Sequence, residues 1–329
     1  MYSNSWMSWG AVPMLKLEAS TATINSHLAT LGQRFDEEMT KWKASFTGYP
    51  PFTASLHKLL LRNRNALLVG SVAELRALIE AIDLATGSTL TPYMHARQQK
   101  SFTKQSHMEK LLKALDKVFD YDKFIYKSQG WNAYKLVGSH GLRICPYCHL
   151  NHVNYHGQAT SNATPKKLEM RPPLDHFLPK SIYPYLAVSL HNLVPSCHQC
   201  NSSIKGDEVP GADLPHPFDP AVALDMSFGI KGSALAIHGV TNGEISLAVT
   251  GNGAWDEFSR FFYLEERYQW YTPEVSDMLK RQRDLDESDK IVQSLVRRPA
   301  FILGFNPDDC ERRALGICLH SIARQQGII

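Results

Sequence analysis

The sequence has no long hydrophobic run and no strong excess of charge of one sign. No stretch approaches the roughly 20 apolar residues of a membrane-spanning helix, and the segment from Met1 to Leu15 has no cationic start, so we expect neither a membrane span nor a signal peptide. The net charge of +3 excludes a protein that coats nucleic acid through bulk electrostatics. We therefore expect a cytoplasmic protein, in which any phosphate-binding surface is local.

The composition is that of an ordinary folded protein. Of the 329 residues, 43% are hydrophobic and 20% are charged, which is unlike the low hydrophobicity and high charge of disordered chains. There is no internal repeat and no low-complexity tract. The length allows two domains or one elaborated domain.

The first part of the chain has helical periodicity. Apolar residues spaced three and four apart, such as Leu56 and Leu60, predict that residues 1–130 form a helical region. Ser71 and Glu74 fit a capping box at a helix start, and a second helix is expected from His107 to about Tyr121.

The rest of the chain divides into two further regions. Residues 131–210 are rich in Cys, His, Asn and Pro, which predicts a compact site built from loops and short elements. Within 211–329, short strands are expected at Met226 to Ile230, Leu235 to His238 and Glu244 to Val249. Helices should follow from Trp255 to about Val296, separated near Pro273.

Four of the six cysteines fall in two C-x-x-C pairs, formed by Cys145 with Cys148 and by Cys197 with Cys200. One tight turn can point both thiolates of such a pair at the same ion, so the two pairs predict a structural zinc site. The alternative is redox chemistry, but neither pair lies in a thioredoxin-like βαβ pattern. Cys310 and Cys318 stand apart and are expected to be buried or idle thiols.

A second group of polar residues lies between and beside the cysteine pairs. Asp175 and His176 are adjacent, Asn192 precedes an apolar run, and Asn201 directly follows Cys200. Each residue alone has an ordinary interpretation, as a surface pair, a turn cap or a helix residue. The ordered set resembles the HNH endonucleases, whose pattern is an Asp-His pair, an internal Asn, and a final His or Asn beside a C-x-x-C.

The resemblance covers roughly Cys145 to Gly206 and implies a ββα-metal core. A first strand would end near His176, a second would cover Leu193 to Ser196, and a helix would start near Cys197. The expected fold class is thus α+β, a mainly helical chain with a central zinc-stabilised nuclease core and a few short strands after it.

Phosphodiester hydrolysis requires a base that activates water and a cation that offsets charge on the phosphate. His176 is the candidate base, because imidazole titrates near neutral pH. The carboxylate of Asp175 and the amide of Asn201 offer hard oxygen ligands, which suit Mg²⁺ or Mn²⁺ better than zinc. By similarity to the family, Asn192 braces the loop and orients His176. Lys205, Lys180 and Arg171 are the expected phosphate-binding residues.

A longer string, from Asp175 through Tyr185 and on to Cys197, is similar to HNH proteins of bacterial anti-phage systems such as Septu and retron loci. This likeness implies an effector nuclease that works with an ABC-type ATPase partner, with DNA as the first expected substrate. Two alternatives remain open. One is an HNH effector that cleaves RNA or tRNA, and the other is a non-catalytic, zinc-stabilised binding module.

Overall fold

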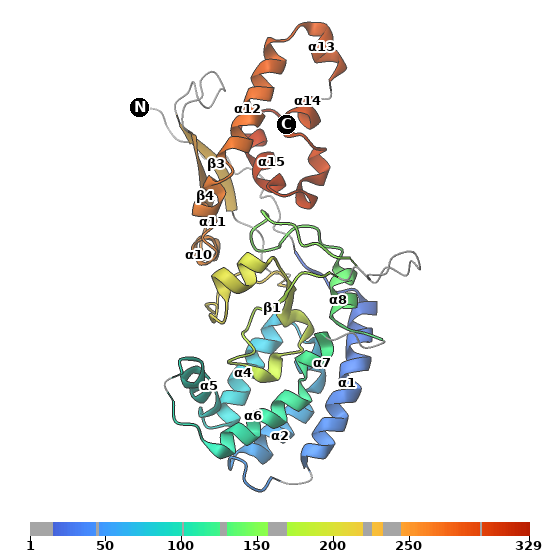
Figure 1. Ribbon diagram of the computed structural model, residues 1–329, viewed down its shortest axis with the longest axis vertical. Coiled ribbons are helices and arrows are strands. Elements are labelled where there is room, and N and C mark those ends of the chain that lie inside the picture. Colours follow the sequence, from blue (N-terminus) through green and yellow to red (C-terminus); the bar gives the residue numbers. More distant parts are fainter. Residues whose placement is uncertain are drawn as a thin grey trace. The chain divides into compact units, whose positions relative to one another are not determined.

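The computed structural model describes residues 16–43, 46–100, 102–125, 130–156, 170–219, 226–232, 245–296 and 298–329. In these residues the protein is mixed α+β and mainly helical, with two small antiparallel sheets, as expected (Figure 1). Its internal contacts define two compact units. The first comprises residues 17–142 and 153–212, and the second comprises 143–152 together with 213–329. Within the described ranges, no helix combines the length and the apolar character that crossing a membrane requires.

The first unit is built largely of helices that precede the small sheet in the chain. Their order along the chain is α1 (Thr21–Lys43), α2 (Thr53–Arg62), α3 (Arg64–Val69), α4 (Val72–Ala85), α5 (Leu90–Gln98), α6 (Ser106–Val118), α7 (Tyr121–Ile125) and α8 (Ala133–His140).

Helix α4 begins where the capping box predicts. The Ser71 hydroxyl accepts a hydrogen bond from the backbone N–H of Glu74, and the Glu74 carboxylate accepts one from the N–H of Ser71. Two otherwise unpaired backbone donors at the helix start are thereby satisfied. Leu75, Leu78 and Ile82 then lie buried on one face.

Helix α6 ends at Val118, three residues before the expected end at Tyr121. The Asp120 carboxylate accepts a hydrogen bond of 2.8 Å from the backbone N–H of Lys123, which is the bond of a helix N-cap. The chain therefore starts a new helix, α7, and Tyr121 is its first residue. The apolar face of α6 is as predicted, since Leu111, Leu112, Leu115 and Val118 are all buried.

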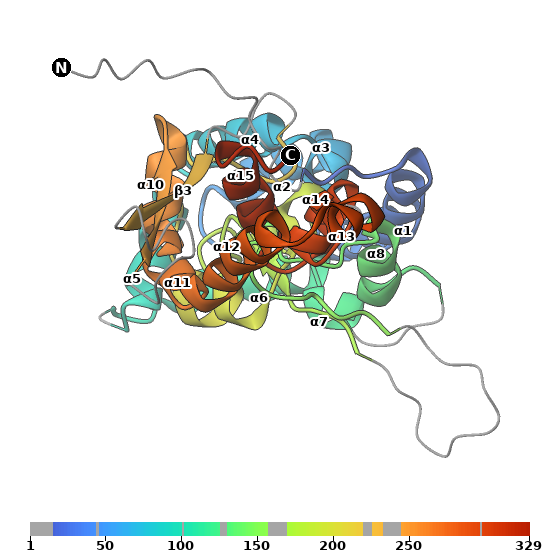
Figure 2. The ribbon, with the colours of Figure 1, turned by 90° about the horizontal axis from the view of Figure 1, so that it is seen from above.

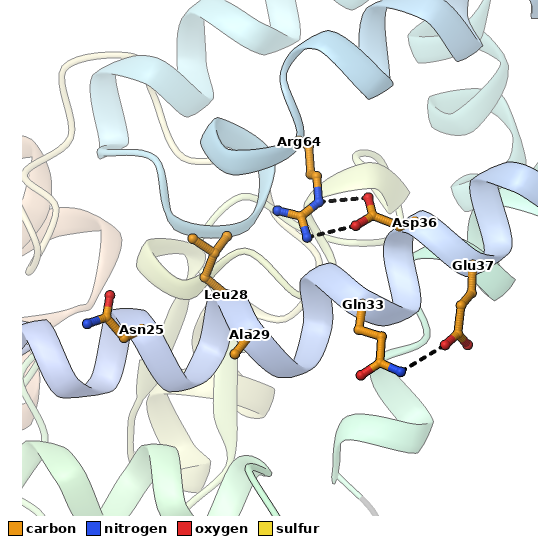
Figure 3. A pocket seen from close by; sticks show the side chains of 7 residues that line it. All are labelled: Asn25, Leu28, Ala29, Gln33, Asp36, Glu37 and Arg64. Carbon is orange, nitrogen blue, oxygen red and sulfur yellow. Dashed lines mark hydrogen bonds and ion pairs between the residues drawn. The ribbon is translucent and has the colours of Figure 1, made fainter.

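Helices α1 and α3 are joined by an arginine. The guanidinium of Arg64 makes two hydrogen bonds, of 2.7 and 2.9 Å, to the carboxylate of Asp36 (Figure 3). A Cβ atom at Gly32 would collide with this guanidinium, so a larger residue there would force the end of the Arg64 side chain to shift.

A two-stranded sheet lies in the same unit. Strand β1 (Leu174–His176) pairs antiparallel with β2 (Leu193–Pro195), so that Asp175 faces Val194 and His176 faces Leu193. The connection contains two short 3₁₀ turns, η1 (Pro184–Leu186) and η2 (Leu190–Asn192). After β2 the chain enters a π-helix, η3 (Gln199–Lys205). This rare form has i→i+5 hydrogen bonds and occurs frequently at functional sites.

The second unit contains a hairpin followed by helices. Strand β3 (Met226–Gly232) pairs antiparallel with β4 (Ile245–Gly251), and the expected strand from Leu235 to His238 lies outside the described residues. The helical elements that follow are α10 (Ala254–Phe261), α11 (Leu264–Gln269), α12 (Thr272–Glu287), α13 (Lys290–Leu295), α14 (Arg298–Leu303), η4 (Pro307–Arg312) and α15 (Gly316–Gln325).

Pro273 lies in the first turn of α12 and so separates it from α11, as predicted. Helix α12 contacts α13 and α14, and the three helices lie together in both views (Figures 1 and 2). Helix α15 lies against β3.

Candidate functional site

The four cysteines of the two C-x-x-C pairs form one buried group. The sulfur atoms of Cys145, Cys148, Cys197 and Cys200 all lie within 4.8 Å of one another. Four thiolates around one zinc ion have Zn–S distances of about 2.3 Å, and a tetrahedron of that size places the sulfurs roughly 4 Å apart. The donor set and its spacing therefore fit a metal ion such as zinc.

Backbone and side-chain hydrogen bonds shape the first of these turns. The backbone N–H of Cys145 donates to the carbonyl of Asn151 over 2.9 Å, and that of His149 donates to the carbonyl of Cys145 over 3.0 Å. The Asn151 side-chain amide donates to the sulfur of Cys148 at 3.8 Å. The Tyr268 hydroxyl donates to the Cys148 carbonyl at 2.9 Å, which ties this turn to α11.

The second turn leads into η3. The backbone N–H of Cys200 donates to the sulfur of Cys197 at 3.4 Å, and that of Asn201 donates to the Cys197 carbonyl at 3.0 Å. N–H groups that point at a sulfur stabilise its thiolate form, which is the form that binds a metal.

Asp175 lies in the middle of β1 and is paired with a lysine. Its Oδ1 atom lies 3.1 Å from the Nζ atom of Lys205, and the two side chains are only 2% and 1% exposed. The same ammonium donates to the backbone carbonyl of His176 at 2.7 Å. Lys205, expected at the substrate phosphates, thus uses two of its three N–H donors inside the protein, and its contact with phosphate stays a prediction.

The imidazole of His176 is held through one nitrogen. Its Nε2 atom lies 2.8 Å from the carbonyl oxygen of Ala187, which can only accept a hydrogen bond. Nε2 therefore carries the hydrogen, and in the neutral ring Nδ1 has the lone pair. Burial lowers the pKa of His176 to about 3, an effect that the bond to Ala187 opposes and the nearby Lys180 and Lys205 reinforce. The ring is accordingly neutral at pH 7.

Asn192 is fully buried at the end of η2, in the connection between β1 and β2, and its side chain hydrogen-bonds to the backbone of that connection. Its Oδ1 atom accepts from the backbone N–H of Leu178 at 2.7 Å, and its Nδ2 donates to the carbonyls of Leu178 and Leu186 at 2.9 and 3.1 Å. Leu186 precedes Ala187, whose carbonyl holds His176. The asparagine therefore fixes the segment that orients the imidazole.

The two remaining basic residues lie at aromatic rings. The Lys180 ammonium is exposed and lies 4.6 Å from the centre of the Tyr121 ring. The Arg171 guanidinium lies 5.5 Å from the centre of the Tyr134 ring and donates to the Pro172 carbonyl at 3.0 Å.

Asn201 lies four residues before Lys205 on η3, which is about one turn of a π-helix. Lys205 is buried and contacts both Asp175 and His176, whereas Asn201 is partly exposed, and its approach to Asp175 stays a prediction. The Asn201 amide nitrogen donates to the Ser202 hydroxyl at 3.3 Å, so its amide oxygen is the atom that could serve as a ligand.

Sequence reasoning did not identify two participants of this site. One is the carbonyl of Ala187, which no side-chain motif can reveal. The other is Tyr121, whose ring centre lies 4.5 Å from that of His176, although the two residues are far apart in the chain. In the sequence, the local feature that marks Tyr121 is that it is an aromatic residue directly after the N-cap aspartate Asp120.

No family model, no curated protein and no solved structure matches the chain.

Proposed function

We propose that this protein is a metal-dependent endonuclease of the HNH type that hydrolyses phosphodiester bonds, with DNA as the first expected substrate. One observation carries the proposal. An Asp-His pair lies on a short strand of an antiparallel pair, and the histidine Nε2 is bonded to a carbonyl so that Nδ1 is left as the proton acceptor. A general base requires a neutral imidazole with one unprotonated nitrogen, and here that nitrogen is Nδ1.

In this proposal His176 removes a proton from the attacking water through Nδ1. Asn192 contributes indirectly, since it holds the segment that carries the Ala187 carbonyl. The buried surroundings keep the ring neutral, so no proton has to leave it before it can act. A pKa of about 3 also makes the ring a weaker base than a free imidazole, and in the proposal the negative charge of the bound phosphate raises that pKa.

Asp175 and Asn201 would hold Mg²⁺ or Mn²⁺ through one carboxylate oxygen and one amide oxygen. A divalent cation bound there supplies the positive charge that offsets charge on the phosphate and the leaving oxygen. Lys205 already neutralises much of the Asp175 carboxylate, so the protein offers few charged ligands. Water and substrate oxygens have to complete the shell, as is usual for Mg²⁺.

The phosphate contacts fall mainly to the cations at the rim of this site. Lys180 is exposed and lies close enough to His176 to affect its pKa. Arg171 is partly exposed. In the proposal, Lys205 serves chiefly to hold Asp175, because its side chain is only 1% exposed, and its third N–H would meet a phosphate oxygen only after the residues that cover it move.

The test is a cleavage assay on plasmid DNA and on total tRNA, with Mg²⁺, with Mn²⁺ and with EDTA. We expect metal-dependent nicking of DNA by the wild-type protein and a loss of about 100-fold or more in His176→Ala. Cleavage of tRNA alone would replace DNA by RNA as the substrate.

His107→Ala is the matched control, since His107 is an exposed histidine of the same unit, on α6. It should cleave as the wild type does. Cleavage by His176→Ala at the wild-type rate would contradict the proposal and favour the non-catalytic binding module.

We further propose that the nuclease is an anti-phage effector in the cytoplasm that acts with an ABC-type ATPase. The support is the resemblance of the segment from Asp175 to Cys197 and the net charge of only +3, which suits a nuclease that depends on a partner to capture substrate. Co-purification with an ATPase encoded beside it, and phage protection lost in His176→Ala, would support this assignment. Protection that survives in that variant would contradict it.

A further inference from the structure

Tyr121 contacts two residues of the candidate site from outside the segment that carries the motif. It is the first residue of α7, whereas the cysteine pairs and the Asp-His pair all follow Gly141 in the chain. Its ring meets the imidazole of His176 edge to face, with centroids 4.5 Å apart and planes at 69°. Its ring centre also lies 4.6 Å from the Lys180 ammonium.

The contact with His176 completes the restraint on the imidazole. A single hydrogen bond from Nε2 to the Ala187 carbonyl selects the tautomer but still allows the ring to tilt about that bond. An aromatic ring packed at 4.5 Å limits this tilt, and the edge-to-face arrangement adds attraction beyond that of the buried area alone. The direction of the Nδ1 lone pair therefore depends on Tyr121.

The contact with Lys180 restrains a cation. Lys180 is exposed, and fixing a lysine side chain costs conformational entropy. Attraction between the ammonium and the nearby aromatic ring offsets part of that cost. Tyr121 therefore raises the fraction of time that the ammonium spends near His176 before any substrate arrives, which lowers the cost of binding a phosphate there.

We propose that Tyr121 is a positioning residue of the nuclease site, which sets the orientation of the His176 imidazole and the place of the Lys180 ammonium with the same ring. This inference rests on the proposed function. The positioning effect comes from the aromatic ring of Tyr121 and not from its hydroxyl, because both contacts are made by the ring. A helix of the N-terminal helical region thereby becomes part of the active site.

The test compares Tyr121→Phe, which keeps the ring, with Tyr121→Leu, which keeps most of the apolar volume. Cleavage of a plasmid or a labelled duplex is measured to give kcat and KM. We expect Tyr121→Phe to stay within about twofold of the wild type. Tyr121→Leu should lower kcat about tenfold or more through the histidine, and raise KM several-fold through the lysine.

The double variant separates these two effects. Lys180→Met should raise KM with little change in kcat, and adding Tyr121→Leu should lower kcat without raising KM further, because the lysine contact is already gone. Tyr49→Leu is the matched control, since the Lys110 ammonium lies 4.5 Å from the Tyr49 ring centre, outside the site. It should leave both constants unchanged.

A spectroscopic measurement reads the contact without activity. The carbon-bound ring protons of His176 should show a ring-current shift in the NMR spectrum, and their signals are identified because they are absent from the spectrum of His176→Ala. Tyr121→Leu should remove this shift, and Tyr121→Phe should keep it. Unchanged kcat and KM in Tyr121→Leu, beside a His176→Ala variant that is inactive, would overturn this inference alone. Wild-type activity in His176→Ala would overturn the proposed function instead, and the positioning role with it.

Discussion

The ammonium of Lys205 lies 3.1 Å from the carboxylate of Asp175, and both side chains are almost completely buried. Removing one partner of a buried ion pair leaves the other charge without compensation, at a cost of about 3–5 kcal/mol. We therefore expect Lys205→Ala to lower the free energy of unfolding by about that amount. Urea unfolding followed by circular dichroism measures it.

Two further variants make this prediction specific. Asp175→Leu combined with Lys205→Met removes both charges and should recover most of the lost stability. Arg260→Ala breaks an exposed pair with Asp256 and should cost less than about 1 kcal/mol. If Lys205→Ala costs no more than Arg260→Ala, the buried pair does not contribute as proposed.

Asn192 bonds three buried backbone groups with one side chain. Asn192→Ala leaves the N–H and the carbonyl of Leu178 without these bonds, whereas the Leu186 carbonyl still accepts from the backbone N–H of Ser189. Each unsatisfied buried group costs about 1–3 kcal/mol, so we expect a loss of about 2 kcal/mol or more in stability. Cleavage should also fall by at least about tenfold, because the Ala187 carbonyl is no longer held against His176.

Asn65→Ala is the control for this substitution, since Asn65 is an exposed asparagine of the same unit. Its stability should lie within about 0.5 kcal/mol of the wild type. Equal stability of the two variants in urea unfolding would show that Asn192 does not brace the connection between β1 and β2.

The four buried thiols should hold one zinc ion in the purified protein. Because a structural zinc contributes folding free energy directly, Cys197→Ser should lose the metal and lower the melting temperature by about 10 °C or more. Cys310→Ser should keep the bound metal and the melting temperature of the wild type, since Cys310 is outside the group of four cysteines. Elemental analysis and thermal unfolding measure the two quantities. Metal-free wild-type protein with four reactive thiols would contradict the site.

The features that the sequence predicts well are those determined by residues close together in the chain. The start of α4 depends on Ser71 and Glu74, three positions apart, and the structure has both hydrogen bonds of that capping box. The grouping of the four cysteines was predictable for another reason. Two C-x-x-C turns have few uses other than to share one ion, so their spacing indicates a common site even across a long linker.

The features that the sequence does not reveal depend on contacts between distant residues. A lysine after a cysteine pair looks like a surface cation, and only the packing of η3 against β1 buries Lys205 beside Asp175, 30 positions away. The role of Tyr121 is missed for the same reason, because only the tertiary fold brings it into contact with His176 and Lys180. The end of α6 was missed because apolar periodicity outweighed the N-cap signal of Asp120.

His27 gives the fold of the first unit a dependence on pH. It is fully buried in α1, its Nε2 donates to the Val188 carbonyl at 2.8 Å, and its Nδ1 accepts from the Trp131 indole at 3.1 Å. Burial lowers the pKa of His27 to about 4. The hydrogen bond to Val188 opposes this effect, and His191 adds a smaller lowering of the pKa.

The folded pKa of His27 lies below its unfolded value of 6.5, so the unfolded chain takes up the proton first as the pH falls. The stability that neutral His27 contributes is therefore fully present above about pH 6.5 and is lost progressively down to about pH 4, to a total of about 3 kcal/mol. Urea unfolding at pH 7.5, 6, 5 and 4 measures this loss. His27→Gln, which can still donate and accept hydrogen bonds, should lose less stability over the same interval. An equal pH dependence in wild type and variant would show that His27 is not the group responsible, because the glutamine side chain has no proton to gain in this range.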